Sequence, residues 1–584
     1  MNILPRGATF RRLVAARWPW ILLLLVIAFA YYGSYVRHGI GFRDEGQTVA
    51  FGALRLLRGE VPMRDVVLNY NVLWFYPVVW LYELFGVSYV LLRGYCFALS
   101  TLTAVLAFFL VERTTRKPWL AFAVALIAVL IPGSTFKNYI PLLAVANTLC
   151  LLHVALAPAT GRSWIWKTAL GAVVLGLSFL IRIDIGLLLA ALWLGFCVLR
   201  VGLGEGPWKQ RLLQSGVMIA LLCGIVSAVH LPFWLDAKRR GFDREFAGQY
   251  AEKWRTIHHP VTRLLMPRKV AAAPPRAGPH KIAAQSVASS PSVAGDKKAL
   301  QRTELREMTK GGQNIGADFL FLTYAPVVGA VTLILMGLAW LFQESRSGTG
   351  VRAQRGFLAV LVLIVGALST FPQFFFFRPD LPHLSEFMPG YLAAAVAALG
   401  ILWSPEKRWR QWPAVAALLL LVHVAGYVAL VLPERWAGTW AARKKRTKLF
   451  TAENGVNVYV SSRELAGLTA IQKLLREHAP QPTDYVVCYP YSPGINLLAD
   501  RPTYERNVYV DNAMRTSRWD ETAIANFERY RPAAIVLSDW DINGTDASRF
   551  SVWAVKTKTW IQTHYVFQGS YITGSDAFEI YTRP

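Results

Sequence analysis

Two adjacent carboxylates, Asp44 and Glu45, follow the first long apolar run and are the first candidates for chemistry in this sequence. An acidic pair at the mouth of a membrane bundle can hold a developing positive charge, accept a proton or coordinate a metal. The same stretch has a structural explanation, because Asp44 and Gln47 together form a capping box for a following helix. A cap is compatible with a catalytic role, so both interpretations stay open at this point.

Two further groups of charged residues stand at the ends of apolar runs. Arg182 and Asp184 lie two residues apart between two runs, and Arg378, Asp380 and His383 precede another. Charged side chains are costly at membrane depth and tend to face a bundle interior or a wet cavity. The first group has an alternative role as a structural ion pair, and His383 taken alone is equally compatible with a structural histidine. In the second group two prolines favour an irregular backbone, on which a guanidinium, a carboxylate and an imidazole suit a bound phosphate.

The composition indicates an integral membrane protein with a soluble part. The 584 residues are 54% hydrophobic and only 17% charged, which is too apolar for a soluble chain of this size. The net charge of +26 does not indicate a nucleic-acid partner, because the basic residues recur in short clusters between apolar runs, as topology signals do. The five cysteines have no metal-ligand spacing, so neither a disulfide framework nor a cysteine metal site is predicted.

Eleven apolar runs predict a polytopic α-helical membrane domain over residues 1–432. Several are shorter than the roughly 20 residues that a perpendicular span needs, so their boundaries are soft. The runs lie near 18–35, 88–111, 118–133, 139–157, 167–182, 183–199, 212–235, 318–342, 356–374, 387–403 and 412–432.

Basic clusters in alternate connections set the expected orientation. All five clusters lie on the same side as the arginine-rich N-terminus, which the positive-inside rule places in the cytoplasm. An odd number of spans then places the C-terminus outside. The outer face receives a first external loop at 36–87, a long external loop at 236–317, Lys137 and the charged groups described above.

Two segments outside the apolar runs have their own predicted structure. Residues 60–87 are rich in aromatic residues and predict two short helices that lie in the membrane interface. Residues 433–584 have the composition of a water-soluble fold, with helices predicted at 465–478 and 521–530 and strands at 484–489, 533–538, 566–572 and 578–582. This alternation predicts a small extracytoplasmic α/β domain.

These motifs together resemble the GT-C superfamily of polytopic glycosyltransferases, in the bacterial branch related to protein mannosyltransferases and aminoarabinose transferases. The first matching pieces are the basic N-terminus, Asp44-Glu45-Gly46 and the segment from Leu56 to Pro62. The others are Leu84 to Ser88 with Arg93, Arg182 to Gly186, Arg378 to His383, and Pro493 to Pro502. The resemblance covers most of the chain, but each piece is short.

The resemblance implies an inverting transfer of a sugar from a polyprenyl-phosphate carrier to an acceptor hydroxyl, at the outer face of a bacterial inner membrane. It implies that Asp44 is the base that activates the acceptor, with Glu45 assisting. The carrier phosphate is assigned to Arg378 and His383, with Arg182 and Lys137 as further candidates and Asp184 and Asp380 in support. The partners are then a lipid-linked donor, membrane lipids and a glycan, lipid or protein acceptor, without a nucleotide. Some relatives use a divalent cation and others do not, and no complete metal site is recognisable in the sequence.

Two alternative functions remain compatible with the sequence. An O-antigen-type ligase or polymerase would use the same carriers on the same face of the membrane. A lipid-linked sugar flippase or transporter would also have charged residues inside a helix bundle, but paired repeats or broken-helix symmetry would be expected. The acidic pair directly after the first helix favours the GT-C interpretation.

Overall fold

The structure is a computed structural model of the 584-residue chain. It describes residues 8–34, 36–42, 45–68, 70–131, 135–157, 163–204, 206–251, 317–346, 350–371, 381–403, 411–510, 518–540, 546–574 and 576–584.

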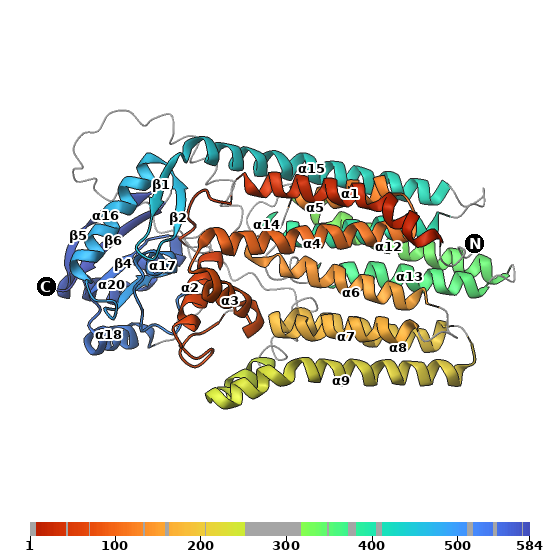
Figure 1. Ribbon diagram of the computed structural model, residues 1–584, viewed down its shortest axis with the longest axis horizontal. Helices are drawn as coiled ribbons and strands as arrows, with labels where there is room; N and C mark the ends of the chain where they lie inside the picture. The colour runs from red at the N-terminus through yellow and green to blue at the C-terminus, as the bar shows by residue number, and fades with distance from the viewer. Residues whose placement is uncertain are drawn as a thin grey trace, which may run out of the picture.

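Long helices form a bundle that occupies most of the molecule (Figure 1). Each of the eleven predicted apolar runs overlaps one of them. The helices are α1 (Ala8–Gly33), α4 (Tyr89–Thr115), α5 (Pro118–Leu130), α6 (Tyr139–Ala155), α7 (Ser163–Ile181), α8 (Ile183–Leu203), α9 (Trp208–Arg240), α12 (Ala317–Arg346), α13 (Gly350–Leu368), α14 (Leu381–Leu402) and α15 (Gln411–Lys445). Within the described part of the chain, seven helices are long and apolar enough to cross a membrane. The helical membrane fold is therefore confirmed, while the number of spans stays a prediction.

Helix α14 forms the centre of the bundle. In its apolar window 83% of the residues are buried, against 22% in the windows of α9, α12 and α15. A run of small residues allows this close packing, because Ala393, Ala394, Ala395, Ala397 and Ala398 are fully buried. The peripheral helices keep large apolar side chains exposed, as expected for surfaces that face lipid.

Contacts between helix ends define two ends of the bundle. At one end Arg17 of α1 pairs with Glu112 of α4 at 2.6 Å, and Gly400 of α14 lies against Thr115 of α4. Among the described residues, Arg113, Arg116 and Lys117 follow Glu112 at this end of α4. The soluble domain lies at the opposite end, and the described N-terminal helix begins far from it (Figure 1). The predicted orientation of the chain in the membrane stays a prediction.

A small α/β domain follows α15. A two-stranded antiparallel sheet, β1 (Lys448–Thr451) and β2 (Asn457–Val460), precedes α16 (Ser462–His478). A four-stranded sheet has the order β3-β4-β6-β5, with β3 parallel to β4 and the remaining pairs antiparallel. Its strands are β3 (Val486–Tyr489), β4 (Ala534–Leu537), β5 (Val566–Thr573) and β6 (Asp576–Thr582), and its helices include α17 (Pro493–Ala499), α18 (Trp519–Tyr530), α19 (Phe550–Trp553) and α20 (Val555–His564).

The predicted helices and strands of this domain are confirmed to within a few residues. Strands β3 and β4 are buried along their full length, as continuous apolar runs require in a covered parallel pair. The predicted domain boundary at residue 433 falls inside α15, which continues to Lys445 before β1 begins at Lys448. Helix α15 therefore connects the bundle directly to the domain.

Short helices lie between the bundle and the domain (Figure 1). Helix α2 (Glu45–Leu57) begins at the second residue of the acidic pair. Two helices were predicted in 60–87, but the structure has one, α3 (Tyr76–Phe85), and the buried 3-10 turn η1 (Val72–Trp74) leads directly into it. Exposed Trp80, Leu84 and Phe85 give α3 the apolar surface of an interfacial helix. A second 3-10 turn, η2 (Thr135–Lys137), precedes α6.

Candidate functional site

The acidic pair stands at the start of α2, which begins at Glu45. Asp44 and the side chain of Glu45 lie outside the described residues, so their contacts and the capping box stay predictions. The partial positive charge of a helix N-terminus stabilises nearby carboxylates in the ionised form. Helix α2 packs against η2, so the segment that carries the acids adjoins the segment that carries Lys137.

Lys137 and His383 are brought together although 246 residues separate them in the sequence. Nζ of Lys137 lies 2.8 Å from Nε2 of His383, and the two residues are 3% and 4% exposed. An ammonium group has only donors, so a protonated Lys137 requires Nε2 of His383 to accept and leaves the imidazole neutral. The sequence predicted both residues separately, and the structure makes them one unit.

Arg182 occupies the break between α7 and α8. Its extended backbone, with φ near −154°, lets Asp184 lie beside it, with the carboxylate oxygens 2.9 and 3.2 Å from Nε. The guanidinium carbon lies 5.2 Å from the centre of the Tyr70 ring, which stacks on Trp74 at 4.0 Å. Nη1 of Arg182 is buried without a hydrogen-bond partner among the described residues. The ion pair with Asp184 therefore leaves a donor of Arg182 available to a ligand.

Glu386 is a buried acid that the sequence reasoning missed. It lies one helical turn after His383 on α14, is 2% exposed, and is close enough to Arg182 to interact electrostatically. A carboxylate directly before the predicted run at 387–403 was the available signal, because acids at membrane depth mark functional positions. Glu386 links Arg182 to the helix that carries His383.

Asn71 was also missed, and it fixes the first external loop on the end of α7. Its side-chain amide donates to the carbonyl of Phe179 at 3.0 Å, its backbone N–H donates to that of Ile181 at 3.2 Å, and its Oδ1 caps η1. This placement holds the neighbouring Tyr70 next to Arg182. An asparagine in a polar loop gives no sequence signal for such a contact.

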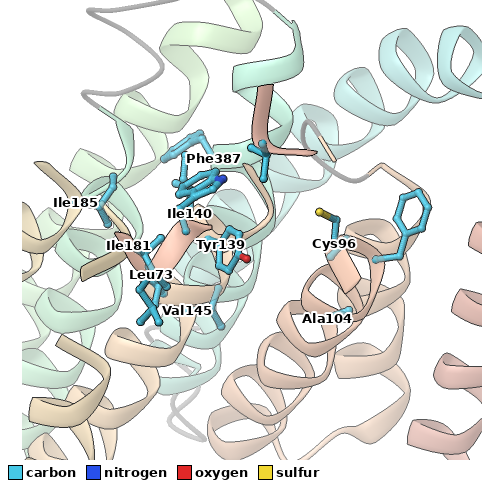
Figure 2. Close-up of a cluster of buried hydrophobic side chains, with 14 of the residues drawn as sticks. Leu73, Cys96, Ala104, Tyr139, Ile140, Val145, Ile181, Ile185 and Phe387 are labelled. Carbon is cyan, nitrogen blue, oxygen red and sulfur yellow. The ribbon is translucent and has the colours of Figure 1, made fainter. Parts of the chain in front are cut away.

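Apolar side chains pack beneath these charged groups. Leu73, Tyr139, Ile140, Ile181 and Phe387 come from η1, α6, α7 and α14 and form part of one buried cluster (Figure 2). Three of them adjoin Arg182, Glu386 and the η2 segment in the sequence. Lys137, His383 and Glu386 are themselves buried, and electrostatic interactions between buried groups are stronger than in water.

Two predicted site residues and the question of a metal site remain. Arg378 and Asp380 lie outside the described residues. In the part of the chain that the structure describes, no group of three His, Cys, Asp or Glu side chains is arranged to hold a metal ion.

Comparisons with known proteins give a partial sequence match and a match in fold. A family model described as a domain of unknown function (DUF6311) matches residues 83–268. No curated protein matches the sequence.

Three solved structures illustrate the likeness. ArnT from Cupriavidus metallidurans in the apo state is 14% identical, with a TM-score of 0.50 over 97% of this chain and 98% of that chain. The same ArnT bound to undecaprenyl phosphate is 14% identical, with a TM-score of 0.47 over 96% of this chain and 98% of that one. The oligosaccharyltransferase of Archaeoglobus fulgidus in complex with zinc and sulfate is 13% identical, with a TM-score of 0.47 over 97% of this chain and 73% of that one. At such identities the likeness concerns architecture alone, and this chain has the fold of ArnT.

Proposed function

We propose that this protein is a glycosyltransferase that moves a sugar from a polyprenyl-phosphate donor to an acceptor hydroxyl, with inversion at the anomeric carbon. The observation that carries the proposal is the convergence of Lys137, His383 and Arg182 at the domain end of the bundle. Lys137 contacts His383, Arg182 interacts with Glu386 one turn further along α14, and η2, which carries Lys137, packs against α2, the helix that begins at the acidic pair. A buried group of donors next to a segment with carboxylates suits a reaction in which an anion leaves as a hydroxyl attacks.

The basic groups would bind the carrier phosphate and stabilise it as it leaves. Lys137 supplies a point charge, while Arg182 has planar donors suited to phosphate oxygens. Arg378 completes the proposed set together with His383. Asp184, Asp380 and Glu386 would orient these cations and limit the excess positive charge before the donor binds.

The acidic pair would activate the acceptor. Asp44 takes the proton of the acceptor hydroxyl as its oxygen forms a bond to the anomeric carbon, and Glu45 assists. The bond between that carbon and the phosphate oxygen breaks at the same time, and its electron pair leaves with the polyprenyl phosphate. The donor brings its own leaving group, so no nucleotide takes part.

The reaction would take place on the outer face of a bacterial inner membrane, with the N-terminus in the cytoplasm. Basic residues of the described connections after α4 and between α8 and α9, among them Arg113, Arg200 and Arg211, support this orientation because they lie at helix ends remote from the C-terminal domain. A phosphatase fusion, active only outside, should be active at Pro584 and inactive at Arg408. The reverse pattern would overturn the orientation.

Turnover by purified protein tests the function. A panel of polyprenyl-monophosphate sugars, with a chelator added or omitted, should yield at least one donor that is consumed with release of polyprenyl phosphate. Asp44→Asn keeps a capping side chain but cannot accept a proton, so turnover should fall about 10²- to 10⁴-fold with an unchanged melting temperature.

Two results would contradict parts of the proposal. Consumption only of polyprenyl-diphosphate oligosaccharides would instead indicate a ligase or polymerase. Near-normal turnover by Asp44→Asn would move the base to Glu45 or another carboxylate.

A further inference from the structure

The C-terminal domain contacts the segment that follows the acidic pair. Helix α17 of the domain packs against α2, the N–H of Gly494 contacts the carbonyl of Phe42 at 3.5 Å, and the rings of Phe42 and Phe578 meet edge to face at 5.1 Å. The domain therefore contacts residues on both sides of the acidic pair, and not only the end of α15.

Arg55 is the main polar connection between α2 and the domain. It is 2% exposed, and its Nη1 donates to the backbone carbonyl of Glu505 in the domain at 2.8 Å. Its other nitrogens contact the Glu60 carboxylate at 2.6 and 2.8 Å and the Asp65 carbonyl at 3.2 Å. One guanidinium thus joins α2, the loop after it and the domain.

The domain also supports the turn that follows α2. Met63 in this turn has φ of +63°, in the left-handed region that costs a residue with a Cβ about 1–2 kcal/mol. The guanidinium of Arg506 in the domain donates to the Met63 carbonyl at 2.9 Å, and the backbone carbonyl of Arg506 accepts from the Val67 N–H at 2.8 Å. These two bonds hold the strained turn, and with it the loop that Arg55 contacts.

Helix α2 connects these contacts to the site. It has 13 residues, and a helix of that length is a rigid rod of about 20 Å. Arg55 connects its last turn to the domain, its first residue is Glu45, and it packs against η2, which carries Lys137, while Phe42 gives the domain a second contact just before the helix. If α2 tilts because its Arg55 end is released from the domain, the acidic pair at its other end is displaced relative to the proposed phosphate-binding groups.

We propose that the C-terminal domain holds α2 in the position that the reaction needs, and that Arg55 is the positioning residue through which it does so. This inference rests on the proposed function. Arg55 touches no proposed substrate group and acts through the helix.

The first test compares Arg55, in the last turn of α2, with Arg58, which directly follows that helix. Arg58 also pairs with the domain, through Asp500, but its side chain is 32% exposed. We expect Arg55→Ala to lower kcat about 10- to 100-fold with little change in the KM of the donor, because the base is displaced while the phosphate groups remain. Arg58→Ala should stay within about twofold of wild type, because exposed pairs contribute little. Equal kcat values for Arg55→Ala and wild type would overturn the proposal.

Two further variants separate positioning from loss of folding. Arg506→Ala removes the bond to Met63 without unpairing Arg55, and it should lower kcat in the same direction as Arg55→Ala. The second variant combines Arg55→Ala and Cys223→Ser with Arg58→Cys and Asp500→Cys. A short bis-methanethiosulfonate linker between the two new cysteines should restore kcat, and reduction of the linker should abolish the recovery. Failure of the formed linker to restore kcat would overturn the positioning role.

Hydrogen exchange tests the inference without turnover. Amides 49–54 of α2 should exchange faster in Arg55→Ala than in wild type or Arg58→Ala, while those of β3 and β4 stay protected. Unchanged exchange in α2 would contradict the inference even if every donor proves inactive. Wild-type protein with no turnover but with this exchange pattern would instead place the failure in the proposed function.

Discussion

The two ends of the bundle use the same charged residue types in different ways. At the end remote from the domain, Arg17 pairs with Glu112 and stays 27% exposed, and Arg200 donates to Gln214 at 3.0 Å. At the domain end, Lys137, His383 and Glu386 are all at most 4% exposed, and Arg182 has a buried donor without a partner among the described residues. Charged residues at the first end are bound in pairs, whereas those at the second end come together from several helices and turns.

We propose that the charges at the remote end set the topology and that those at the domain end serve the reaction. Burying several ionisable groups costs several kcal/mol each, and a bundle can pack as well with apolar residues in their place. A site that retains them is therefore expected to exchange stability for activity. The following predictions test this contrast, from the largest expected effect to the smallest.

Lys137→Met should have the largest effect. Methionine has a similar length but no charge, so the leaving phosphate would lose a buried cation and kcat should fall about 10²- to 10³-fold. Loss of the bond to Nε2 of His383 should cost about 1–3 kcal/mol of stability, so the fall in kcat is measured per folded molecule. Turnover and thermal unfolding measured in one detergent check both parts. Retained turnover would leave the phosphate to Arg182 and Arg378.

Arg182→Lys should reduce kcat/KM by about tenfold. The ammonium keeps the charge and can still pair with Asp184, but it loses the planar donors and the stacking on Tyr70. Kinetics as a function of donor concentration measure the change. Full activity combined with a lower melting temperature would make this residue a structural ion pair, the alternative that the sequence left open.

Arg17→Met should have the opposite signature. The variant leaves Glu112 buried without its cation, which should cost about 1–3 kcal/mol of stability. Turnover per folded molecule should stay at the wild-type level, because this pair lies at the remote end. A large loss of specific activity at unchanged stability would break the contrast between the two ends.

The smallest effect concerns His38, which lies where the first external loop meets β2. Burial and the neighbouring Arg443, Arg446 and Arg93 lower the pKa of His38 from its ordinary value of 6.5. The folded state therefore favours the neutral ring, so this contribution to stability is complete above pH 6.5 and is lost as pH falls through the lowered pKa. His38→Gln should lose less stability below pH 6.5 than wild type does. An identical pH dependence of the melting temperature would exclude His38 as its source.

The sequence by itself determined the classes of structure and their order. Apolar runs with basic connections specified a membrane bundle, and alternating patterns specified α16, α18 and the buried strands β3 and β4. These features follow from hydrophobic periodicity and charge, which are local properties of the chain. The charged residues of the site could also be selected one by one, because acids and bases near membrane runs are costly.

Only the tertiary structure decided which of these residues meet. How separate helices rotate and pack determines three contacts: Lys137 with His383, Glu386 with Arg182, and Asn71 with the end of α7. Local periodicity contains no information about contacts across 246 residues. The connection from Arg55 to the C-terminal domain has the same origin, because its acceptor in the domain is a backbone carbonyl 450 residues away that no side-chain pattern encodes.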